Sequence, residues 1–369
     1  MRLKILVLPG DGIGPEVTAQ AVRVLGAVGQ RFGHTLDCAD APIGGAAIHL
    51  TGSPLPEGTR RLALEADATL LGAVGRPEFD DAPPERRPER GLLALRAAMG
   101  VYANLRPVRA RDGLVGSSPL KPEIVRGTDL IVVRELTAGL YYGQPRGISG
   151  EGPETRAVDT MAYTRAEIER VARVAFAIAG RRRRRVTSVD KSNVLENSRL
   201  WRRVVCEVAR EFPEVTLAHL YVDNCAMQLV LNPSQFDVLL TENMFGDILS
   251  DEAAVLAGSI GMLPSASLGD PRPSGLRAGL YEPVHGSAPD LAGRNVANPL
   301  GAIGSIAAMF EYGFGLTEEA AAIEAAIDAV IAGGTLSADL ARGGRSASTT
   351  EVGDAVVAAI AAGRPVAAA

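Results

Sequence analysis

The sequence is poor in cysteine and in aromatic residues. Its three cysteines, Cys38, Cys206 and Cys225, show no paired spacing, which argues against a disulfide framework. Reduced thiols are typical of the cytoplasm, so we expect a cytoplasmic protein. Aromatic residues make up only 4% of the chain while hydrophobic residues make up 47%, so the core must consist mainly of aliphatic and small side chains.

The sequence also lacks long apolar runs and a strong excess of charge. The segment Ala320 to Ala332 comes nearest to a membrane span, but Glu324 and Asp328 interrupt it, which predicts a surface helix. The first residues contain only a four-residue apolar run before Pro9, which indicates a first strand and not a signal peptide. With 38 basic and 43 acidic side chains, a general nucleic-acid binder is disfavoured. Neither nucleic acid nor a membrane is an expected partner.

Length and pattern predict a two-domain α/β protein. A chain of 369 residues is too long for one average core. Strand-like and helix-like segments alternate throughout, which is typical of α/β folds. Residues 3–8 form a predicted strand, Pro15 then opens a predicted helix, and residues 68–74 form a predicted buried strand.

The segment Gly10-Asp-Gly-Ile-Gly14 lies between the first predicted strand and helix. It does not match the G-x-G-x-x-G dinucleotide fingerprint, and no acidic residue follows at the right distance after a second strand. We therefore interpret it as a tight turn that lets the backbone approach a ligand closely, and not as part of a Rossmann fold.

Two segments are predicted to be irregular. Residues 75–91 are rich in Pro, Arg, Glu and Asp, which predicts an exposed loop, and loops this long are often functional. Residues 141–160 are rich in glycine and predict an extended arm.

The segment Asn243 to Asp251 carries two carboxylates, Asp247 and Asp251, four residues apart. On a helix this spacing places both on one face, while Leu249 and Ala253 fall on the opposite face. Two hard oxygen ligands on a rigid element suit Mg²⁺ or Mn²⁺. On spacing alone, a solvated acidic helix face is the favoured interpretation.

Other side chains with suitable chemistry follow short predicted strands. Asp223 follows the apolar run from Val215 to Val222, Lys191 follows another short strand, and Arg134 and Tyr141 lie further upstream. Acids can hold a metal, arginines can hold carboxylates, and lysine and tyrosine can move protons. Sequence distance does not establish whether they meet in space.

Long strings in the chain resemble the β-decarboxylating dehydrogenases, the family of isocitrate and 3-isopropylmalate dehydrogenases. The resemblance extends from Leu8-Pro-Gly-Asp-Gly-Ile-Gly-Pro-Glu16 to Thr349-Thr-Glu-Val-Gly-Asp354. The strings Pro88-Glu-Arg-Gly-Leu-Leu-Ala-Leu-Arg96 and His285-Gly-Ser-Ala-Pro-Asp290 look most like the branch of the family that uses isopropylmalate.

The resemblance implies a role for each of these positions. The substrate carboxylates would be held by Arg96, Arg106 and Arg134, with Asp223 also at the substrate. The divalent metal, one Mg²⁺ or Mn²⁺ per active site, would be held by Asp223, Asp247 and Asp251. The proton-transfer pair would be Tyr141 and Lys191. The isopropyl group would lie against Leu92 and Leu93, with Glu89 close to the nicotinamide.

The resemblance also implies NAD as cofactor. The segment from His285 to Asn298 would form the adenosine site, although from the residues alone His285 fits a structural role equally well. The implied cofactor-binding positions are Gly75, Glu89, His285, Gly286, Ser287, Ala288, Pro289, Asp290 and Asn298. Asp290 would accept hydrogen bonds from the ribose hydroxyls and repel the 2′-phosphate of NADP.

The implied fold has two domains with a mixed sheet running through both. The cofactor-side domain would comprise residues 1–101 and 258–369. The substrate and dimerisation domain would comprise residues 102–257, with an arm near 134–162 that packs against a second subunit. The expected partner is a second copy of the chain, in a homodimer whose Lys191 and Asp223 reach into the neighbouring active site.

The implied reaction is the oxidative decarboxylation of 3-isopropylmalate to 2-oxoisocaproate, a step of leucine biosynthesis. An alternative is a D-malate, tartrate or homoisocitrate dehydrogenase of the same family, which would differ in the chemistry around Leu92 and Leu93. A non-catalytic regulatory subunit is disfavoured, because Tyr141, Lys191, the three acids and the three arginines are all present.

Overall fold

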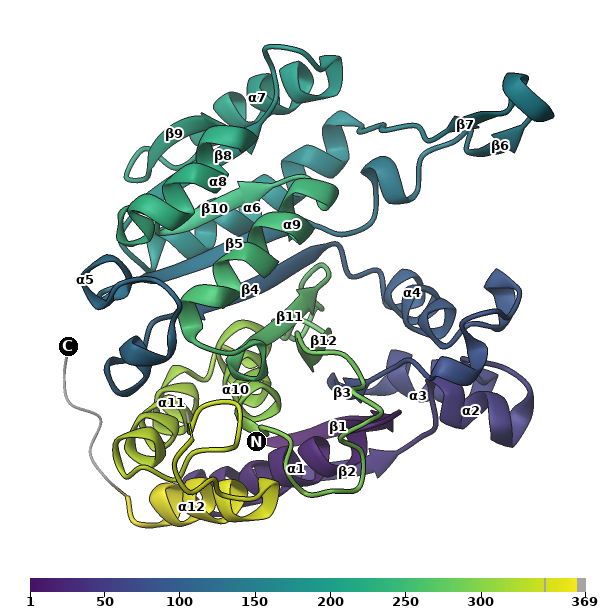
Figure 1. Ribbon diagram of the computed structural model, residues 1–369. Coiled ribbons are helices and arrows are strands. Elements are labelled where there is room, and N and C mark those ends of the chain that lie inside the picture. Colours follow the sequence, from purple (N-terminus) through teal and green to yellow (C-terminus); the bar gives the residue numbers. More distant parts are fainter. Residues whose placement is uncertain (342, 364–369) are drawn as a thin grey trace. The chain divides into compact units, whose positions relative to one another are not determined.

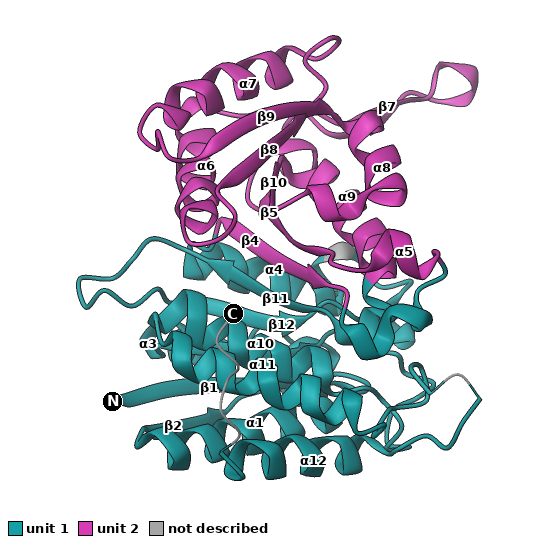
Figure 2. Cartoon of the chain, turned by 90° about the vertical axis from the view of Figure 1, so that its left-hand side faces the viewer, with its two compact units in different colours: residues 1–101, 111–119, 257–369 teal, residues 102–110, 120–256 magenta. Residues whose placement is uncertain are grey.

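The protein, described by a computed structural model over residues 1–341 and 343–363, divides into two compact units (Figures 1 and 2). Unit 1 comprises residues 1–101, 111–119 and 257–369, and unit 2 comprises residues 102–110 and 120–256. This division differs from the expected one mainly in residues 111–119. Arg111 explains the difference, because its guanidinium pairs with Glu324, at 2.5 Å, and with Asp328, both within unit 1.

Unit 1 is built on five strands of a mixed sheet in the order β2-β1-β3-β12-β11. All neighbours are parallel except β11 and β12. The strands are β1 (Arg2–Gly10), β2 (Thr35–Asp40), β3 (Ala68–Ala73), β11 (Pro264–Leu268) and β12 (Gly279–Pro283). The helices are α1 (Gly14–Phe32), α2 (Gly44–Thr51), α3 (Glu57–Glu65), α4 (Pro88–Met99), α10 (Leu300–Ala308), α11 (Thr317–Ala332) and α12 (Thr349–Ala361).

Both faces of the unit 1 sheet are covered. Leu6 and Leu8 of β1 pack in a core cluster with Ala63 of α3 and Leu95 of α4. Because side chains alternate along a strand, Ile5 faces the opposite layer, where α1 lies against β1 and β3 (Figure 1). Residues 5–8 of β1 and all of β3 are therefore buried without a break, as expected for central strands of an α/β sheet.

The Gly10–Gly14 segment is a tight turn, as predicted, but its close approach is to the protein's own backbone. A Cβ on Gly10 would lie 1.9 Å from the Ala73 carbonyl oxygen, and one on Gly12 would lie 1.9 Å from that of Ser287. Both glycines have positive φ, 72° and 58°, which other residues rarely adopt. The glycines thus allow the turn to pack against the ends of neighbouring segments, and the close approach of this turn to a ligand stays a prediction.

Unit 2 contains five further strands of mixed direction, in the order β4-β5-β10-β8-β9, with only β4 and β5 antiparallel. The strands are β4 (Ala103–Arg109), β5 (Asp129–Glu135), β8 (Arg185–Asp190), β9 (Thr216–Tyr221) and β10 (Val238–Thr241). The helices are α5 (Pro122–Val125), α6 (Arg165–Gly180), α7 (Glu196–Ala209), α8 (Val222–Leu231) and α9 (Asn243–Ala254).

The strand orders and antiparallel pairs of the two units differ from the all-parallel Rossmann order, so the prediction against a Rossmann fold is confirmed. In unit 2, α6 and α7 pack on the strands together, and α8 and α9 pack on them as a second pair (Figure 1). A capping box between Thr164 and Glu167 stabilises the N-terminus of α6.

The two segments predicted as irregular are only partly so. Within residues 75–91, short 3₁₀ turns occupy Pro77–Phe79 and Pro84–Arg86, and α4 already begins at Pro88. A proline at the first helical position explains this early start. Residues 141–160 do form an arm, whose tip is a hairpin of β6 (Gly147–Ser149) and β7 (Arg156–Val158).

The apolar segment near the C-terminus is the helix α11, but one side of it is buried, including Ile323 and Ile327, so it is less exposed than the predicted surface helix. Across the described part of the chain, no helix combines the length and apolar character needed to cross a membrane.

Candidate active site

Helix α9 separates an acidic face from a buried face, as predicted. Leu249 and Ala253 are fully buried, whereas the side chains of Asp247 and Asp251 are 34% and 60% exposed. The helix begins directly after Glu242, whose carboxylate accepts hydrogen bonds from the backbone N–H groups of Met244 and Phe245 at 3.1 and 2.5 Å. This cap fixes the first turn of α9 one turn before Asp247.

Arg134, at the end of β5, faces Asp247. Its Nη1 donates to Asp247 Oδ1 at 2.5 Å, and its Nε and Nη2 donate to Asn243 Oδ1 at 3.0 and 2.8 Å. Tyr141, at the base of the arm, donates its hydroxyl to the other oxygen of Asp247 at 2.9 Å, and the Arg134 guanidinium lies 5.8 Å from its ring centre. The structure therefore brings three of the predicted site residues together.

Arg106 joins the same cluster from β4. Its Nη1 donates to Asp251 Oδ1 at 3.0 Å and to Ser250 Oγ at 2.7 Å, and its Nη2 lies 3.7 Å from Asp247 Oδ1. Asn104, two residues earlier on the same face of β4, accepts from Arg106 Nε at 3.0 Å. Two arginines and two carboxylates thus share one site, where they balance each other's charge.

Burial and the hydrogen bond to Asp247 raise the pKa of the Tyr141 hydroxyl above its usual range. The phenol therefore stays protonated at neutral pH and can donate a proton. Its side chain is 41% exposed, so a ligand can reach it.

Lys191 and Asp223 form a separate pair. Lys191 directly follows β8, Asp223 lies in the first turn of α8, and Lys191 Nζ donates to Asp223 Oδ1 at 2.5 Å. This ion pair lowers the pKa of the Asp223 carboxyl. Over residues 1–341 and 343–363, no three His, Cys, Asp or Glu side chains are grouped so that they could hold a metal. A single chain therefore does not bring together the three predicted metal ligands.

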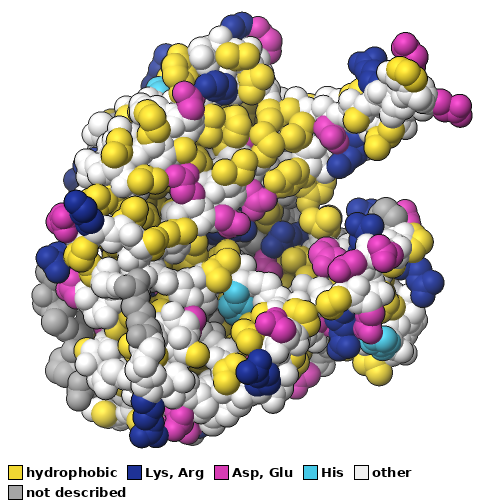
Figure 3. Space-filling view, viewed as in Figure 1, with side chains coloured by type: hydrophobic (Ala, Val, Ile, Leu, Met, Phe, Trp, Pro, Cys, Tyr) yellow, Lys and Arg dark blue, Asp and Glu magenta, His cyan; other side chains and the backbone are white. Residues whose placement is uncertain are grey.

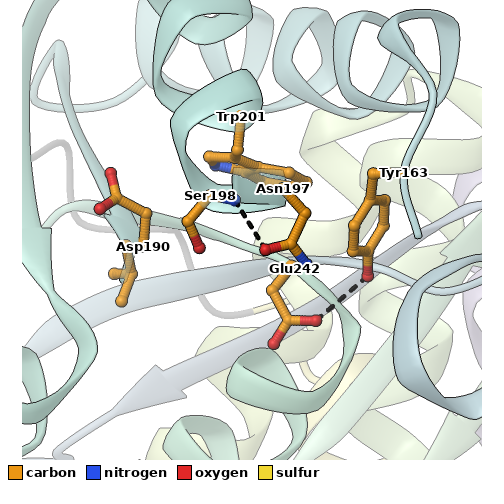
Figure 4. Close-up of a pocket in the computed structure, with 7 residues that line it drawn as sticks. Tyr163, Asp190, Asn197, Ser198, Trp201 and Glu242 are labelled. Carbon is orange, nitrogen blue, oxygen red and sulfur yellow. Dashed lines mark hydrogen bonds between the residues drawn. The ribbon is translucent and has the colours of Figure 1, made fainter. Parts of the chain in front are cut away.

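A small pocket in unit 2 is lined by residues that support both the α9 cluster and the Lys191 loop (Figure 4). Ser198 Oγ accepts from the backbone N–H of Lys191 at 3.1 Å, and Asp190 accepts from that of Ser192 at 2.9 Å. Glu242 accepts from the Tyr163 hydroxyl at 3.1 Å in the same pocket. Its walls thus hold the loop that carries Lys191 and the start of α9.

In unit 1, helix α4 carries the remaining predicted substrate residues. Arg96 donates to Glu282 of β12 at 2.5 Å, and its side chain is 16% exposed. Leu93 is 37% exposed, whereas Leu92 is half-buried and packs against the core cluster. The two leucines of the predicted apolar wall therefore differ, because Leu93 is exposed and Leu92 is partly buried.

Three of the predicted cofactor residues lie close together in unit 1. A Cβ on Gly75 would lie 3.1 Å from Glu89 Oε1 and 3.3 Å from Ser287 Oγ. The loop that contains Gly75 is held by the fully buried Asp11. The carboxylate of Asp11 accepts from the backbone N–H groups of Gly75, Gly45 and Ala46 at 3.0, 2.7 and 2.8 Å, and from Nε of Arg76 at 2.8 Å. Asp11 thus shapes the loop without facing solvent itself.

His285 and Asn298 mark the ends of the predicted adenosine segment. His285 is 9% exposed, burial lowers its pKa, and its buried Nε2 lacks a hydrogen-bond partner within the described residues. Asn298 is buried, and its side-chain oxygen accepts from the N–H of Leu300, the first residue of α10, at 3.0 Å. Between them Gly286, Pro289 and Asp290 are exposed, and Ala288 adopts a positive φ of 38°.

Almost the whole sequence matches the model of one protein family. The family model for isocitrate/isopropylmalate dehydrogenase matches residues 4–356. The chain belongs to the isocitrate/isopropylmalate dehydrogenase family. Its α/β architecture is that of the family, since an isocitrate dehydrogenase from Methylococcus capsulatus superposes with a TM-score of 0.84 at 35% identity, covering 97% of this chain and 99% of that one.

Relatives within the family are similar over almost their whole length. The chain is 58% identical over 358 residues to a 3-isopropylmalate dehydrogenase from Geobacillus kaustophilus, covering 97% of this chain and 95% of that protein. It is 57% identical over 361 residues to a 3-isopropylmalate dehydrogenase from Halalkalibacterium halodurans, covering 98% of each.

Several supporting residues of the site were not singled out from the sequence. They are Asp11, Asn104, Tyr163, Glu242, Asn243, Ser250 and Glu282. Asn243 and Ser250 stand inside the string that contains Asp247 and Asp251, and Asp11 stands inside the Gly10–Gly14 string. Their place in those strings was the available signal, but their partners come from segments far away in the sequence.

Proposed function

We propose that the protein is a 3-isopropylmalate dehydrogenase, which oxidises and decarboxylates 3-isopropylmalate to 2-oxoisocaproate with reduction of NAD in leucine biosynthesis. The observation that carries this proposal is the near full-length identity to proteins of that name, at 57 to 58%. The arginine–carboxylate cluster around α9 supports it, because it offers both anion-binding and metal-binding groups at one place.

The residues present fit a divalent metal in part. Asp247 and Asp251 offer carboxylate oxygens from successive turns of one helix face, and both remain accessible. Mg²⁺ is typically bound by one or two carboxylates together with substrate and water, so the two carboxylates of one chain can form part of its coordination shell. We propose Asp223 of a second copy as the third ligand.

The residues of unit 1 also fit a dinucleotide. The buried Nε2 of His285 lacks a partner in the described chain and could bond a base or ribose. Glu89 and Ser287 lie on either side of Gly75, where a side chain would be crowded. When bound, NAD would accept the hydride, and the metal would polarise the carbonyl and so ease the loss of CO₂.

The chain's own residues would bind the substrate and move its protons. Arg106 and Arg134 would hold carboxylates of the malate core, together with Arg96. Lys191 would take the proton of the hydroxyl group during oxidation, and Tyr141, which stays protonated at neutral pH, would return a proton to the carbon that loses CO₂.

A homodimer is part of the proposal. Helices α8 and α9 and the turn that follows α9 expose large apolar side chains, which are 42 to 64% exposed. They are Met227, Val230, Leu231, Ile248 and Val255. Hydrophobic side chains gather over these helices in Figure 3. An exposed apolar patch of this kind commonly marks a protein interface. A second copy docked there would place a partner beside Asp251 and Asp223, which lie on the same two helices.

The proposal includes a cytoplasmic location. Cys38, Cys206 and Cys225 are all free thiols, as expected in a reducing compartment.

The purified protein should be assayed with a panel of 2-hydroxy diacids, Mg²⁺ and NAD⁺, following NADH absorbance. We expect 3-isopropylmalate to give the highest kcat/KM, well above malate, tartrate, isocitrate and homoisocitrate. The matched control is Lys191→Ala prepared in the same way, which should be inactive and so exclude a contaminating host enzyme. A clear preference for another member of the panel would assign the alternative activity within the family.

A further inference from the structure

In the unit 2 cluster of Arg106, Arg134, Asp247 and Asp251, each arginine donates hydrogen bonds to a buried asparagine. Asn243 Oδ1 accepts from both Nε and Nη2 of Arg134, at 3.0 and 2.8 Å, and Asn104 Oδ1 accepts from Nε of Arg106 at 3.0 Å. Asn243 is fully buried and Asn104 is 1% exposed. Because Arg134 lies at the end of β5 and Asn243 opens α9, their contact ties the strand to the helix that carries Asp247.

Asn243 is itself held on two further sides. Its Nδ2 donates to the Ala138 carbonyl at 3.0 Å, and its backbone N–H donates to the Tyr163 hydroxyl at 2.9 Å. A flipped amide would point its NH₂ group at the guanidinium and its oxygen at the Ala138 carbonyl, which would create two repulsive contacts. The amide therefore has one stable orientation, and it presents a fixed acceptor to Arg134.

A neutral acceptor suits this position. Two hydrogen bonds along the Nε–Nη2 edge prevent the guanidinium from rotating about its terminal side-chain torsions. The direction of Nη1 towards Asp247 is therefore set before a substrate binds. A carboxylate could accept from the same edge, but it would add a second negative charge to an arginine that already pairs with Asp247, and so weaken its attraction for a substrate carboxylate. An amide orients the arginine without adding a further negative charge.

We propose that Asn243 is a positioning residue for Arg134, which holds the guanidinium in the one orientation that receives a substrate carboxylate beside Asp247. This inference rests on the proposed function, because it requires Arg134 to bind a 2-hydroxy diacid. Tyr163 and Glu242 support Asn243 from the pocket of Figure 4, by fixing the backbone at the start of α9.

The test compares Asn243→Ala and Asn243→Asp with the wild-type enzyme. Misplacing a binding group by about 1 Å can cost about 100-fold in rate, so we expect Asn243→Ala to lower kcat/KM for 3-isopropylmalate by about 10- to 100-fold, mostly through KM. Asn243→Asp keeps an acceptor but adds a second carboxylate beside Arg134, so its KM should also rise. Thermal unfolding of each variant reports whether the fold is kept.

A double-mutant cycle separates positioning from a general structural role. In an Arg134→Ala background there is no guanidinium to orient, so adding Asn243→Ala should change KM by less than about twofold. The matched control is Asn104→Ala, which contacts Arg106 instead and should retain its full effect in the Arg134→Ala background. Where turnover is too slow to measure, the same cycle is run on the Kd of 3-isopropylmalate by calorimetry.

The outcomes are distinct. An undiminished effect of Asn243→Ala in the Arg134→Ala background would overturn the inference, as would an unchanged KM in a folded Asn243→Asp variant, which decides the matter if Asn243→Ala does not fold. If the wild-type enzyme prefers another 2-hydroxy diacid, the proposed substrate is wrong and the cycle with that diacid still tests Asn243. If it neither turns over nor binds any diacid of the panel, both proposals fall.

Discussion

Asp247 contacts three other predicted site residues. It accepts hydrogen bonds from Arg134 and Tyr141, and Arg106 lies 3.7 Å away. These cations and the phenol hold its carboxylate in place and leave it 34% exposed. A carboxylate held in this way is suited to bind a cation that enters with the substrate, because its orientation is set before binding.

We expect Asp247→Asn to weaken metal binding. The amide removes one negative charge and one strong oxygen ligand, so half-maximal activity should require about 10- to 100-fold more Mg²⁺. The measurement is a Mg²⁺ titration of initial rates at saturating substrate. The control is Glu252→Gln on the same helix, which should leave the Mg²⁺ requirement unchanged. Wild-type activity of Asp247→Asn at low Mg²⁺ would show that Asp247 is not a ligand.

Tyr141 leads to a prediction about pH. Its pKa is raised by burial and by the bond to Asp247, so the neutral phenol persists above about pH 10, the usual tyrosine value. No loss of activity below that pH should therefore come from ionisation of Tyr141. We expect Tyr141→Phe to lower kcat while leaving the alkaline limb of the pH profile in place. A limb that disappears in Tyr141→Phe would mean that Tyr141 ionises within the working range.

Asp290 leads to a prediction about the cofactor. It is exposed in the predicted adenosine segment, where its carboxylate would repel the 2′-phosphate of NADP. Like charges brought together at a binding site cost several kcal/mol, so kcat/KM for NADP⁺ should be about 100-fold or more below that for NAD⁺. Asp290→Asn should narrow this gap. Equal use of both cofactors by the wild-type enzyme would contradict the role of Asp290.

The role of a residue could be predicted from the sequence only where the signal lay in its own segment. The four-residue spacing of Asp247 and Asp251 placed both on one helix face, but only the family resemblance gave them a role as metal ligands. Asn243 belongs to the same string, but its function depends on Arg134, which lies over 100 residues away and reaches it only through the pairing of β5 and β10. Such a contact has no signal in one sequence.

Among the elements, α4 shows how a helix divides its leucines between core and surface. Leu95 is fully buried, Leu92 packs against the core cluster in part, and Leu93 is 37% exposed. The resemblance predicted that both Leu92 and Leu93 line the substrate pocket. Their different burial means that a change at Leu92 would also disturb packing, and it makes Leu93 the cleaner probe of substrate preference.

We expect Leu93→Ala to lower kcat/KM for 3-isopropylmalate by about tenfold or more relative to its effect on malate, since each buried methylene is worth about 1–3 kcal/mol to specificity. Its effect on the free energy of unfolding should stay within about 0.5 kcal/mol. Leu95→Ala is the contrasting variant and should lose about 2–5 kcal/mol of stability. Equal losses for both substrates in Leu93→Ala would remove this leucine from the pocket.

Elements with a clear periodic pattern were predicted well. The first strand, the helix opened by Pro15 and the helix carrying Asp247 all lie where the pattern placed them. The start of α4 was missed because its first turn is polar and follows a charged loop, so composition alone suggested that the loop continued. The glycines of the Gly10–Gly14 turn correctly indicated a tight turn, and in the structure they lie against the backbone of Ala73 and Ser287.

At the scale of the whole molecule, the two units hold different parts of the proposed chemistry. Unit 1 holds the predicted cofactor segment, Arg96 and the leucines of α4, and unit 2 holds the α9 cluster and the pair of Lys191 and Asp223. Within unit 2 that pair is separate from the α9 acids, in that the described residues form no three-acid metal group. The shared dimeric site proposed above would account for this separation, because each chain would complete its neighbour's site.

Subunit complementation tests this sharing directly. In a mixed dimer of Lys191→Ala and Arg106→Ala protomers, the first protomer's Arg106 would meet the second protomer's Lys191 and form one intact site. The other site would carry both changes. Random exchange of equal amounts makes half of the dimers mixed, and half of their sites intact, so activity should reach about a quarter of the wild-type value.

Each variant alone should be nearly inactive, which makes the recovery easy to detect. If Lys191 served the site of its own chain, every site in a mixed dimer would carry one change and no activity would return. The control is a mixture of Lys191→Ala with Asp223→Ala, since both changes lie on the same side of the proposed shared site and should not complement. Subunit exchange must first be verified with differently tagged protomers. After verified exchange, activity that stays at the level of the single variants would show that each chain completes its own site.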